Sequence, residues 1–361
     1  MEQSNRNTPR ASPLTSDVGQ RVPLPSDGLR PSAGIAAFWK WWDLGGGRRL
    51  SKAIDRNRRH EVERALNSLL ADIDPRLSWE IAPTIAGLRR LTVTANGHPE
   101  LRCLARRWLL AAPKADPYWR FADLLGPLDA TVLKFRGLDV DIEDTWVRLF
   151  PSETTFRAAV SHPLMGVLEA PERTELARVL LDAACGEAAV ENWIAQVTAT
   201  EVVSEDAVDL KGVATALVEL SIDNLSADLE PAWRVLQGTH DGKPMVAMAR
   251  VPLVPLIRPE CDQHVQIDVP FSDDSEGGFP GPESLPQLRE FEDGLIDLVA
   301  LRGECVAAET MPGVRRMHFY TDSLSDATQQ LVDAAAKWPQ GDAVAVAEMD
   351  PAWRAVAHLR A

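Results

Sequence analysis

The stretch RRMHFYT brings basic and aromatic side chains together at a spacing of two residues. Successive side chains of a β-strand point to opposite faces, so Arg316, His318 and Tyr320 are expected on one face and Met317 and Phe319 on the other. Basic and aromatic side chains on an open sheet face can contact a protein or a small molecule, or stack on RNA bases. Arg316, His318 and Tyr320 are therefore the candidate interaction surface. The alternative is that a hairpin or the first domain covers this face.

Catalytic chemistry is not indicated by any pattern in the chain. The seven histidines show no zinc-binding spacing, and the sequence contains no nucleophile elbow, phosphate-binding loop or dinucleotide-binding glycine motif. An acidic loop contains Asp273, Asp274 and Glu276, but its spacing matches no calcium-binding loop, so a solvated acidic surface is expected. We therefore predict no catalytic residues, no cofactor and no metal site.

The stretch HDGKPMVAMAR contains an Asp-Gly pair between two apolar runs. Asp-Gly is the preferred pair for a two-residue type I′ turn, because both turn positions need a positive φ. A turn at this point pairs Val235 with Met248 and Gln237 with Val246, which brings apolar side chains together. A β-hairpin is therefore predicted here, rather than a ligand-binding loop.

The elements after this hairpin predict a compact α+β domain. Strands are expected near residues 264–271, 305–310, 313–322 and 342–349, with helices at 285–302 and 324–338. Their order is β-α-β-β-α-β, the ferredoxin-like arrangement, in which two helices cover one face of a four-stranded antiparallel sheet. The hairpin then extends the sheet or covers part of its other face.

The first half also reads as mixed α+β. Helices are expected near residues 49–71, 98–113, 172–194 and 209–220, with strands at 77–83, 88–96, 118–125, 131–142, 146–150, 155–164 and 195–203. The order α-β-β-α-β and the dipeptide RR before a strand occur in both halves, which leaves a divergent internal repeat open. The aromatic cluster from Phe38 to Trp42 is either a first helix packed onto the domain or a membrane-surface anchor.

The predicted fold class is therefore α+β with two domains. Residues 1–32 offer few apolar side chains to bury and are predicted to be a disordered tail. Residues 33–225 form the N-terminal α+β domain, and residues 226–361 form the C-terminal ferredoxin-like domain with its hairpin.

Several short motifs in the second half occur together in one order. W-x-V precedes DGKP, an acidic Gly-Pro loop precedes L-x-x-F-E-D-x-L, and T-x-P-G-V-R-R-M-H-F-Y precedes a final D-P-x-W. Through these motifs residues 230–355 resemble the bacterial domain-of-unknown-function family 695. That family is related in fold to the regulator of RNase E activity B, a small acidic cytoplasmic protein that inhibits a ribonuclease by binding it. The resemblance implies a ferredoxin-like fold and a regulatory role, and it supplies no catalytic residues.

Charge and cysteine content point to a compartment and exclude some partners. The formal charge of −15 repels phosphate backbones, so nucleic acid is not an expected partner. No apolar stretch has the length of a signal-peptide core or a membrane span, so no membrane contact is expected. Cys103, Cys185, Cys261 and Cys305 lie far apart and are expected to be buried free thiols. Together these features predict a soluble cytoplasmic protein.

The expected function is that of a non-enzymatic protein with a regulatory role, acting through contacts with an unknown protein partner. The alternative is an enzyme or small-molecule-binding protein with a site between the two domains. A deep pocket with convergent polar groups of perturbed pKa would favour the alternative. A broad apolar or aromatic surface patch would favour protein contacts.

Overall fold

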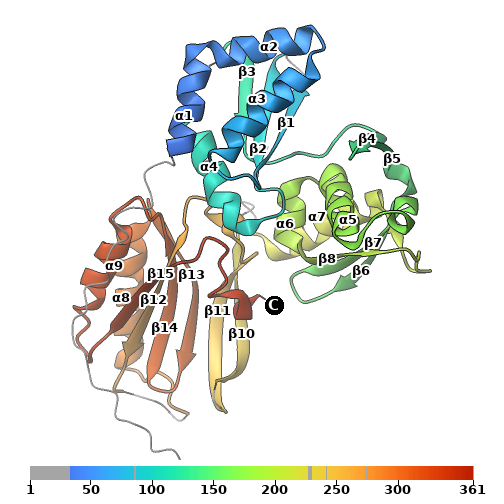
Figure 1. Cartoon of the computed structure of the whole chain (residues 1–361). Coiled ribbons are helices and arrows are strands. Elements are labelled where there is room, and N and C mark those ends of the chain that lie inside the picture. Colours follow the sequence, from blue (N-terminus) through green and yellow to red (C-terminus); the bar gives the residue numbers. More distant parts are fainter. Residues whose placement is uncertain are drawn as a thin grey trace, which may run out of the picture.

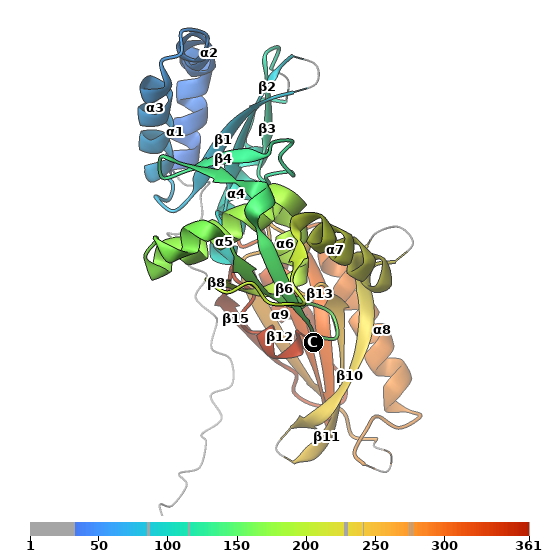
Figure 2. The same ribbon diagram turned by 90° about the vertical axis from the view of Figure 1, so that its right-hand side faces the viewer.

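The computed structural model describes residues 33–360, except 85–86, 115, 227–229, 241, 274 and 276. The predicted disordered tail, residues 1–32, lies outside the described residues. The chain is of the α+β class, as predicted, with helices and several separate sheets. The helical region at the start and the large sheet at the end lie at opposite ends of the molecule in both views (Figures 1 and 2).

The first region packs helices against a small sheet. Its elements are α1 (Ala33–Trp41), α2 (Gly47–Asp55), α3 (Arg59–Ala71), β1 (Ser78–Pro83), β2 (Arg89–Thr94), α4 (Arg102–Leu110) and β3 (Trp119–Ala122). β1 and β2 are antiparallel, and β2 and β3 are parallel. Phe38, Trp39, Trp42 and Trp108 are buried together in the core, so most of the aromatic cluster packs inward instead of facing a membrane.

The helix expected over residues 49–71 is two helices. It breaks before α3 because Asn57 adopts a φ of +54°. Asparagine tolerates this left-handed conformation, which ends a right-handed helix. The helical periodicity continues on both sides of the break, so the apolar pattern predicts both pieces and hides the junction between them.

The middle region has its own core. Its elements are β4 (Val132–Phe135), β5 (Leu138–Asp141), β6 (Trp146–Pro151), β7 (Phe156–Ser161), α5 (Ala170–Cys185), α6 (Glu187–Trp193), β8 (Ile194–Thr200), β9 (Val208–Asp209) and α7 (Leu210–Asn224). The larger sheet has the order β8-β7-β6-β9. Helices α5, α6 and α7 lie on one side of this sheet (Figure 1). Val147, Val160 and Leu180 are among the residues buried between them.

Two expected elements of the middle region are each divided in the structure. The strand predicted over 131–142 is the hairpin β4–β5, which turns at Arg136 and Gly137 with φ of +49° and +86°. The helix predicted over 172–194 breaks into α5 and α6 at Gly186, whose φ is +83°. In both places one or two residues with positive φ interrupt a pattern that is otherwise continuous.

The C-terminal region is a six-stranded antiparallel sheet with two helices. Its elements are β10 (Ala232–His240), β11 (Lys243–Val251), β12 (Gln263–Pro270), α8 (Ser284–Val299), β13 (Gly303–Met311), β14 (Val314–Thr321), α9 (Ala327–Ala335) and β15 (Val344–Met349). The sheet order is β10-β11-β13-β14-β12-β15. Apolar residues of α8 and α9 pack with one face of the sheet, and Leu288, Met317, Phe319 and Leu331 are buried there. Single turns of helix also occur at Pro99–Leu101, Ile142–Asp144, Pro163–Gly166, Pro255–Ile257 and Ala357–Leu359, and the chain is kinked within Trp42–Gly46, between α1 and α2.

The predicted hairpin forms with the expected register. Val235 lies opposite Met248, and Gln237 lies opposite Val246. Gly242 has a φ of +75°, as its turn position requires, whereas Asp241 lies outside the described residues. The hairpin joins the sheet beside β13, so it extends the sheet.

Over β11, β13 and β14 the second face of the sheet is covered by residues 350–360, which we call the closing segment, together with Leu253 and Cys261 from the connection between β11 and β12. Trp353, Val356 and Leu359 are buried against Ala247 and Tyr320. The cover expected from the hairpin or the first domain is therefore provided by the segment that follows β15. The hairpin pairs edge to edge with β13, which directs its strands along the sheet and away from this face.

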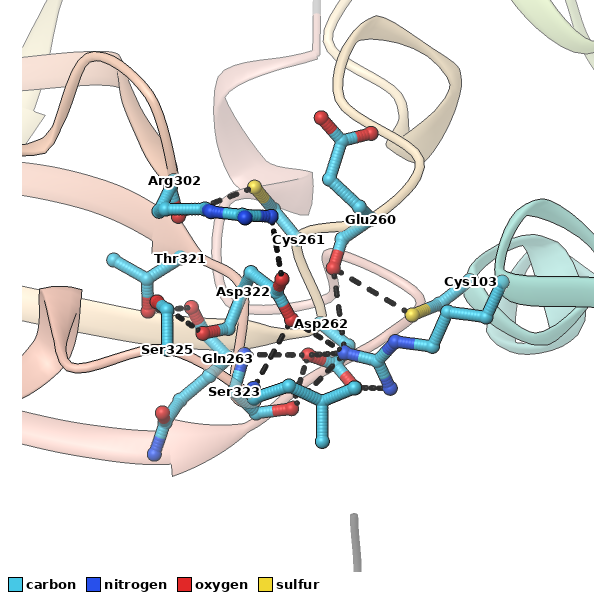
Figure 3. A network of polar contacts seen from close by, with 12 residues as sticks. Cys103, Glu260, Cys261, Asp262, Gln263, Arg302, Thr321, Asp322, Ser323 and Ser325 are labelled. Carbon is cyan, nitrogen blue, oxygen red and sulfur yellow. Dashed lines mark hydrogen bonds and ion pairs between the residues drawn. The ribbon is translucent and has the colours of Figure 1, made fainter. Parts of the chain in front are cut away.

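Helix α4 links the three regions through two buried arginines. Arg102 pairs with Glu187 and Glu191 of α6 at 2.7 and 2.6 Å. Arg107 pairs with Asp262 and Asp322 of the C-terminal region at 2.9 and 2.8 Å. Figure 3 shows Asp262, Asp322 and Ser323 converging on this junction, with Cys103 on the same helix α4. Pairing of this kind offsets the cost of burying a charge, and loss of one partner leaves that cost uncompensated.

Candidate functional site

The three predicted interaction residues lie on β14 as expected for alternating side chains, but they are mostly inside the molecule. His318 and Tyr320 are buried, and Arg316 is partly exposed and pairs with Asp268 at 2.8 Å. The Tyr320 hydroxyl donates a 2.6 Å hydrogen bond to Oδ2 of Asp350, and its ring stacks on Trp353. Interaction through this face stays a prediction, and it would require the closing segment to move.

His318 belongs to a chain of hydrogen bonds that runs across the covered face. Nε2 of His264 lies 3.0 Å from Nδ1 of His318, and Nε2 of His318 lies 3.0 Å from Oε1 of Glu309. His358 of the closing segment contacts the same oxygen at 2.8 Å. The bond between the two imidazoles has one hydrogen, so one of the two nitrogens must be unprotonated. We call these four residues the histidine chain.

The environment fixes the charge of two groups in the histidine chain. Burial, and then the charge of His318, lower the pKa of His264 to about 4. Burial alone would raise the pKa of Glu309, but the hydrogen bonds from His318 and His358 outweigh it and hold the pKa at about 2. At neutral pH Glu309 is therefore an ionised acceptor that ties the closing segment to the sheet.

Tyr320 and Asp350 form a second tie between the sheet and the closing segment. Burial and then the hydrogen bond to Asp350 raise the pKa of Tyr320, so the phenol keeps its proton. Burial opposes ionisation of Asp350, but hydrogen bonds from the backbone of Ala355, from Tyr320 and from the backbone of Arg354 lower its pKa. The titratable groups of this face therefore bind one another, which suits a structural role.

In the middle region, one face of the sheet β8-β7-β6-β9 has the side chains of an interaction surface. On β6, Val147 is buried under the helices, while Trp146 and Arg148 are exposed on the opposite side. Trp146 lies opposite Ser161, and Phe150 lies opposite Arg157. We define the Trp146 face by the side chains that share this side of the sheet: Trp146, Arg148, Phe150, Arg157, Ala159, Ser161, Gln196, Thr198 and Thr200.

Trp146 stands between three hollows in the surface. One of about 230 Å³ extends over Arg148, Phe150 and Val202, and one of about 380 Å³ lies toward His162. A third of about 780 Å³ lies toward Lys211 at the start of α7. A large side chain beside several hollows offers a partner both an aromatic anchor and places to insert its own side chains.

Arginines frame the aromatic residues of the Trp146 face. The Arg148 guanidinium lies 4.7 Å from the centre of the Phe150 ring, and the Arg157 guanidinium lies 5.5 Å from it. Arg148 also pairs with Asp206 at 3.0 Å. These contacts restrict the long side chains, and restricted side chains lose less entropy when they are buried.

The Trp146 face was not singled out from the sequence, although a signal for it exists. In WVRLF the aliphatic residues Val147 and Leu149 alternate with Trp146, Arg148 and Phe150. The arginine indicates which set must face solvent. Both sets contain large apolar residues, however, so the pattern by itself also permits a strand buried on both faces.

Metal and membrane chemistry receive no support from the described part of the chain. Within it, no group of three or more His, Cys, Asp or Glu side chains could hold a metal ion. No helix among those residues is both long and apolar enough to span a membrane. The thiols of Cys103, Cys261 and Cys305 are buried, as predicted, and Cys185 is half-buried.

One part of the chain is similar to a known family. Residues 231–358 match the model of a family of unknown function, DUF695. The match begins just before β10 and reaches His358, so the DUF695 region includes both the six-stranded sheet and most of the closing segment. It agrees with the family resemblance of the sequence motifs. Comparison with the curated proteins and with the solved structures found no match.

Proposed function

We propose that this chain is a non-enzymatic regulator that acts by binding another protein, and that the partner docks on the Trp146 face. One observation carries the proposal: Trp146 is 42 % exposed on a sheet face that points away from its helices, and it borders three hollows. Tryptophan and arginine are the residues that most often dominate binding energy in protein interfaces. The Trp146 face combines both.

The proposal extends to the fold and location of the DUF695 region. The order β13-β14-β12-β15, with α8 and α9 on one face, supports a ferredoxin-like classification of residues 263–349. The sequence resemblance supports a relation to the regulator of RNase E activity B, which also acts by binding a protein. The acidic composition and the buried thiols support a soluble protein of the bacterial cytoplasm.

An enzyme with a site between the two halves is less well supported. The charged groups at that junction pair with one another: Arg107 contacts Asp262 and Asp322, and Ser323 donates a hydrogen bond to Asp262. The titratable groups of the histidine chain are likewise bonded to each other. None of these charged or titratable residues lines any of the five hollows described at the surface.

A protein partner is favoured over RNA on the Trp146 face. Arginine and aromatic side chains on a sheet also suit base stacking. The formal charge of −15 opposes the approach of a polyanion, however, and Arg148 is already neutralised by Asp206. A protein segment can use the aromatic surface without bringing a high density of negative charge.

The test compares two tryptophans of nearly equal exposure. Trp146 is 42 % exposed, and Trp233 on β10 is 39 % exposed and stacked by Arg250. A photo-crosslinking amino acid at position 146 in the native host should capture one protein. With that protein purified, Trp146→Ser should weaken binding by about 2 kcal/mol or more, the size of an interface hot spot.

Trp233→Ser is the control, and it should leave the affinity for the captured protein unchanged. Equal losses from both variants, or none from Trp146→Ser, would exclude the Trp146 face as the docking site. Crosslinking of position 146 to RNA in place of protein would replace this proposal with an RNA-binding function.

A further inference from the structure

Strand β15 forms one edge of the six-stranded sheet and pairs on one side with β12 (Figure 1). Its six residues, VAVAEM, are all exposed or half-exposed. The other side of an edge strand presents backbone N–H and C=O groups that alternate outward without ladder partners. Val344 and Val346, 56 % and 53 % exposed, stand on the face opposite the helices.

Features that normally protect an edge strand are missing from β15. Natural edges are blocked by lysine, proline, a β-bulge or an inward charge. β15 has one charge, Glu348, near its end, and its register with β12 runs without interruption from Val344 to Met349. A regular, nearly uncharged strand edge fits another strand, because a strand pairs with every outward backbone group.

We propose that this edge pairs with β15 of a second copy of the chain, antiparallel about a two-fold axis perpendicular to the sheet. Such an axis keeps equivalent faces together, so residues that meet must belong to the same face. In the register centred on Val346, that residue meets its own copy. Val344 then lies opposite Glu348, and Ala345 lies opposite Ala347.

The sequence of β15 is complementary to itself in this register. The two Val346 side chains form an apolar pair at the axis on the face opposite the helices. The small Ala345 and Ala347 meet on the helix face, where they leave room for the α9 helix that packs over β15 in each copy. Glu348 avoids its own copy, because the two carboxylates lie at opposite ends of the paired segment. The two sheets join into one continuous sheet.

Sedimentation of the full chain tests the proposal. From nanomolar to high micromolar concentration, the wild type should shift from the mass of one chain to twice that mass. Val346→Lys should remain monomeric, because two ammonium groups would meet at the axis. Val218→Lys is the matched control, since Val218 on α7 is 58 % exposed, and it should dimerise like the wild type.

A cysteine variant tests the register independently. Directly opposed residues of an antiparallel pair have Cβ atoms about 4.5–5.5 Å apart, close enough for mild oxidation to join them after a small shift. Val346→Cys should give a reducible covalent dimer, whereas Val218→Cys should not. A wild type that stays monomeric, a Val346→Lys variant that still dimerises, or a dimer that Val346→Cys does not crosslink would each overturn the proposal. A monomeric wild type would leave this edge to a strand from a different protein.

Discussion

Glu309 accepts hydrogen bonds from one histidine of the sheet and one of the closing segment, so a single carboxylate joins the two. Its pKa of about 2 means that this tie survives mild acid. His264 at the other end of the histidine chain has a pKa of about 4, because burial disfavours its charged form. The folded state therefore resists protonation of both Glu309 and His264.

Acid should destabilise the protein in a defined order. Between pH 6.5 and 4, unfolded His264 binds a proton that the folded state excludes, so the free energy of unfolding falls with pH by up to about 3 kcal/mol. Below pH 4.5 unfolded Glu309 also binds a proton, whereas folded Glu309 stays ionised down to about pH 2, and this difference adds to the fall. Urea titrations at several pH values measure how steeply the free energy of unfolding depends on pH. His264→Gln should weaken this dependence between pH 6.5 and 4, and an unchanged dependence would show that His264 is not responsible.

The predicted interaction residues should behave as core residues. Replacing Arg316, His318 and Tyr320 together by serine should lower the free energy of unfolding by several kcal/mol, mainly because Tyr320 loses its stacking on Trp353 and its bond to Asp350. Arg316→Ser alone should cost less than about 1 kcal/mol, since its ion pair with Asp268 is partly exposed. A triple variant that melts like the wild type would restore the open-face hypothesis.

At the scale of single elements, the hairpin offers the sharpest comparison. Gly242 has a φ of +75°, and a Cβ there would meet no atom within 4 Å, so the effect of a side chain is backbone strain alone. Gly242→Val should destabilise the fold by about 1–2 kcal/mol, and Lys243→Ala should have almost no effect. Thermal denaturation distinguishes the two. A large loss from Lys243→Ala with little from Gly242→Val would indicate a ligand-binding loop.

The elements themselves follow from the sequence more readily than their ends. Apolar periodicity predicts the strands and helices of the DUF695 region and the hairpin register, because these depend on neighbouring residues. Breaks at Asn57, Arg136 and Gly186 depend on single positive φ angles, which periodicity does not record. The Trp146 face requires knowing on which side of a sheet the helices pack. In the closing segment only Trp353, Val356 and Leu359 recur, at every third residue, which is too short a pattern to say which surface they cover. Both are decided by tertiary packing.

Over the whole molecule, Arg107 is the main polar link between α4 and the C-terminal region. Arg107→Leu would leave buried Asp262 without a cation and Asp322 with only its 3.6 Å contact to the exposed Arg302, and it should cost about 3–5 kcal/mol in urea denaturation. Arg58→Leu is the control: it removes an exposed ion pair with Glu61 and should cost less than about 1 kcal/mol. Equal small losses would mean that the junction contributes little to stability.

The predicted division at residues 225 and 226 stays a prediction with a direct test. A fragment of residues 226–361 contains the complete six-stranded sheet and its closing segment, and it should unfold cooperatively. It should be less stable than the intact chain, because it lacks Arg107. In the fragment, the double substitution Asp262→Asn and Asp322→Asn should recover part of the lost stability, because it removes the two carboxylates that Arg107 pairs with in the intact chain. A fragment that melts without cooperativity would show that the two halves share one core.

The closing segment has a consequence for how the protein is made. All six strands of the sheet leave the ribosome before Trp353 does, since Trp353 follows β15 in the chain. Until then Ala247, Val306 and Tyr320 face water on a sheet that can already be hydrogen-bonded. A nascent chain at this stage presents the apolar surface that chaperones bind and that makes intermediates aggregate. A delay between the emergence of β15 from the ribosome and that of Trp353 would therefore prolong the exposure of this apolar surface.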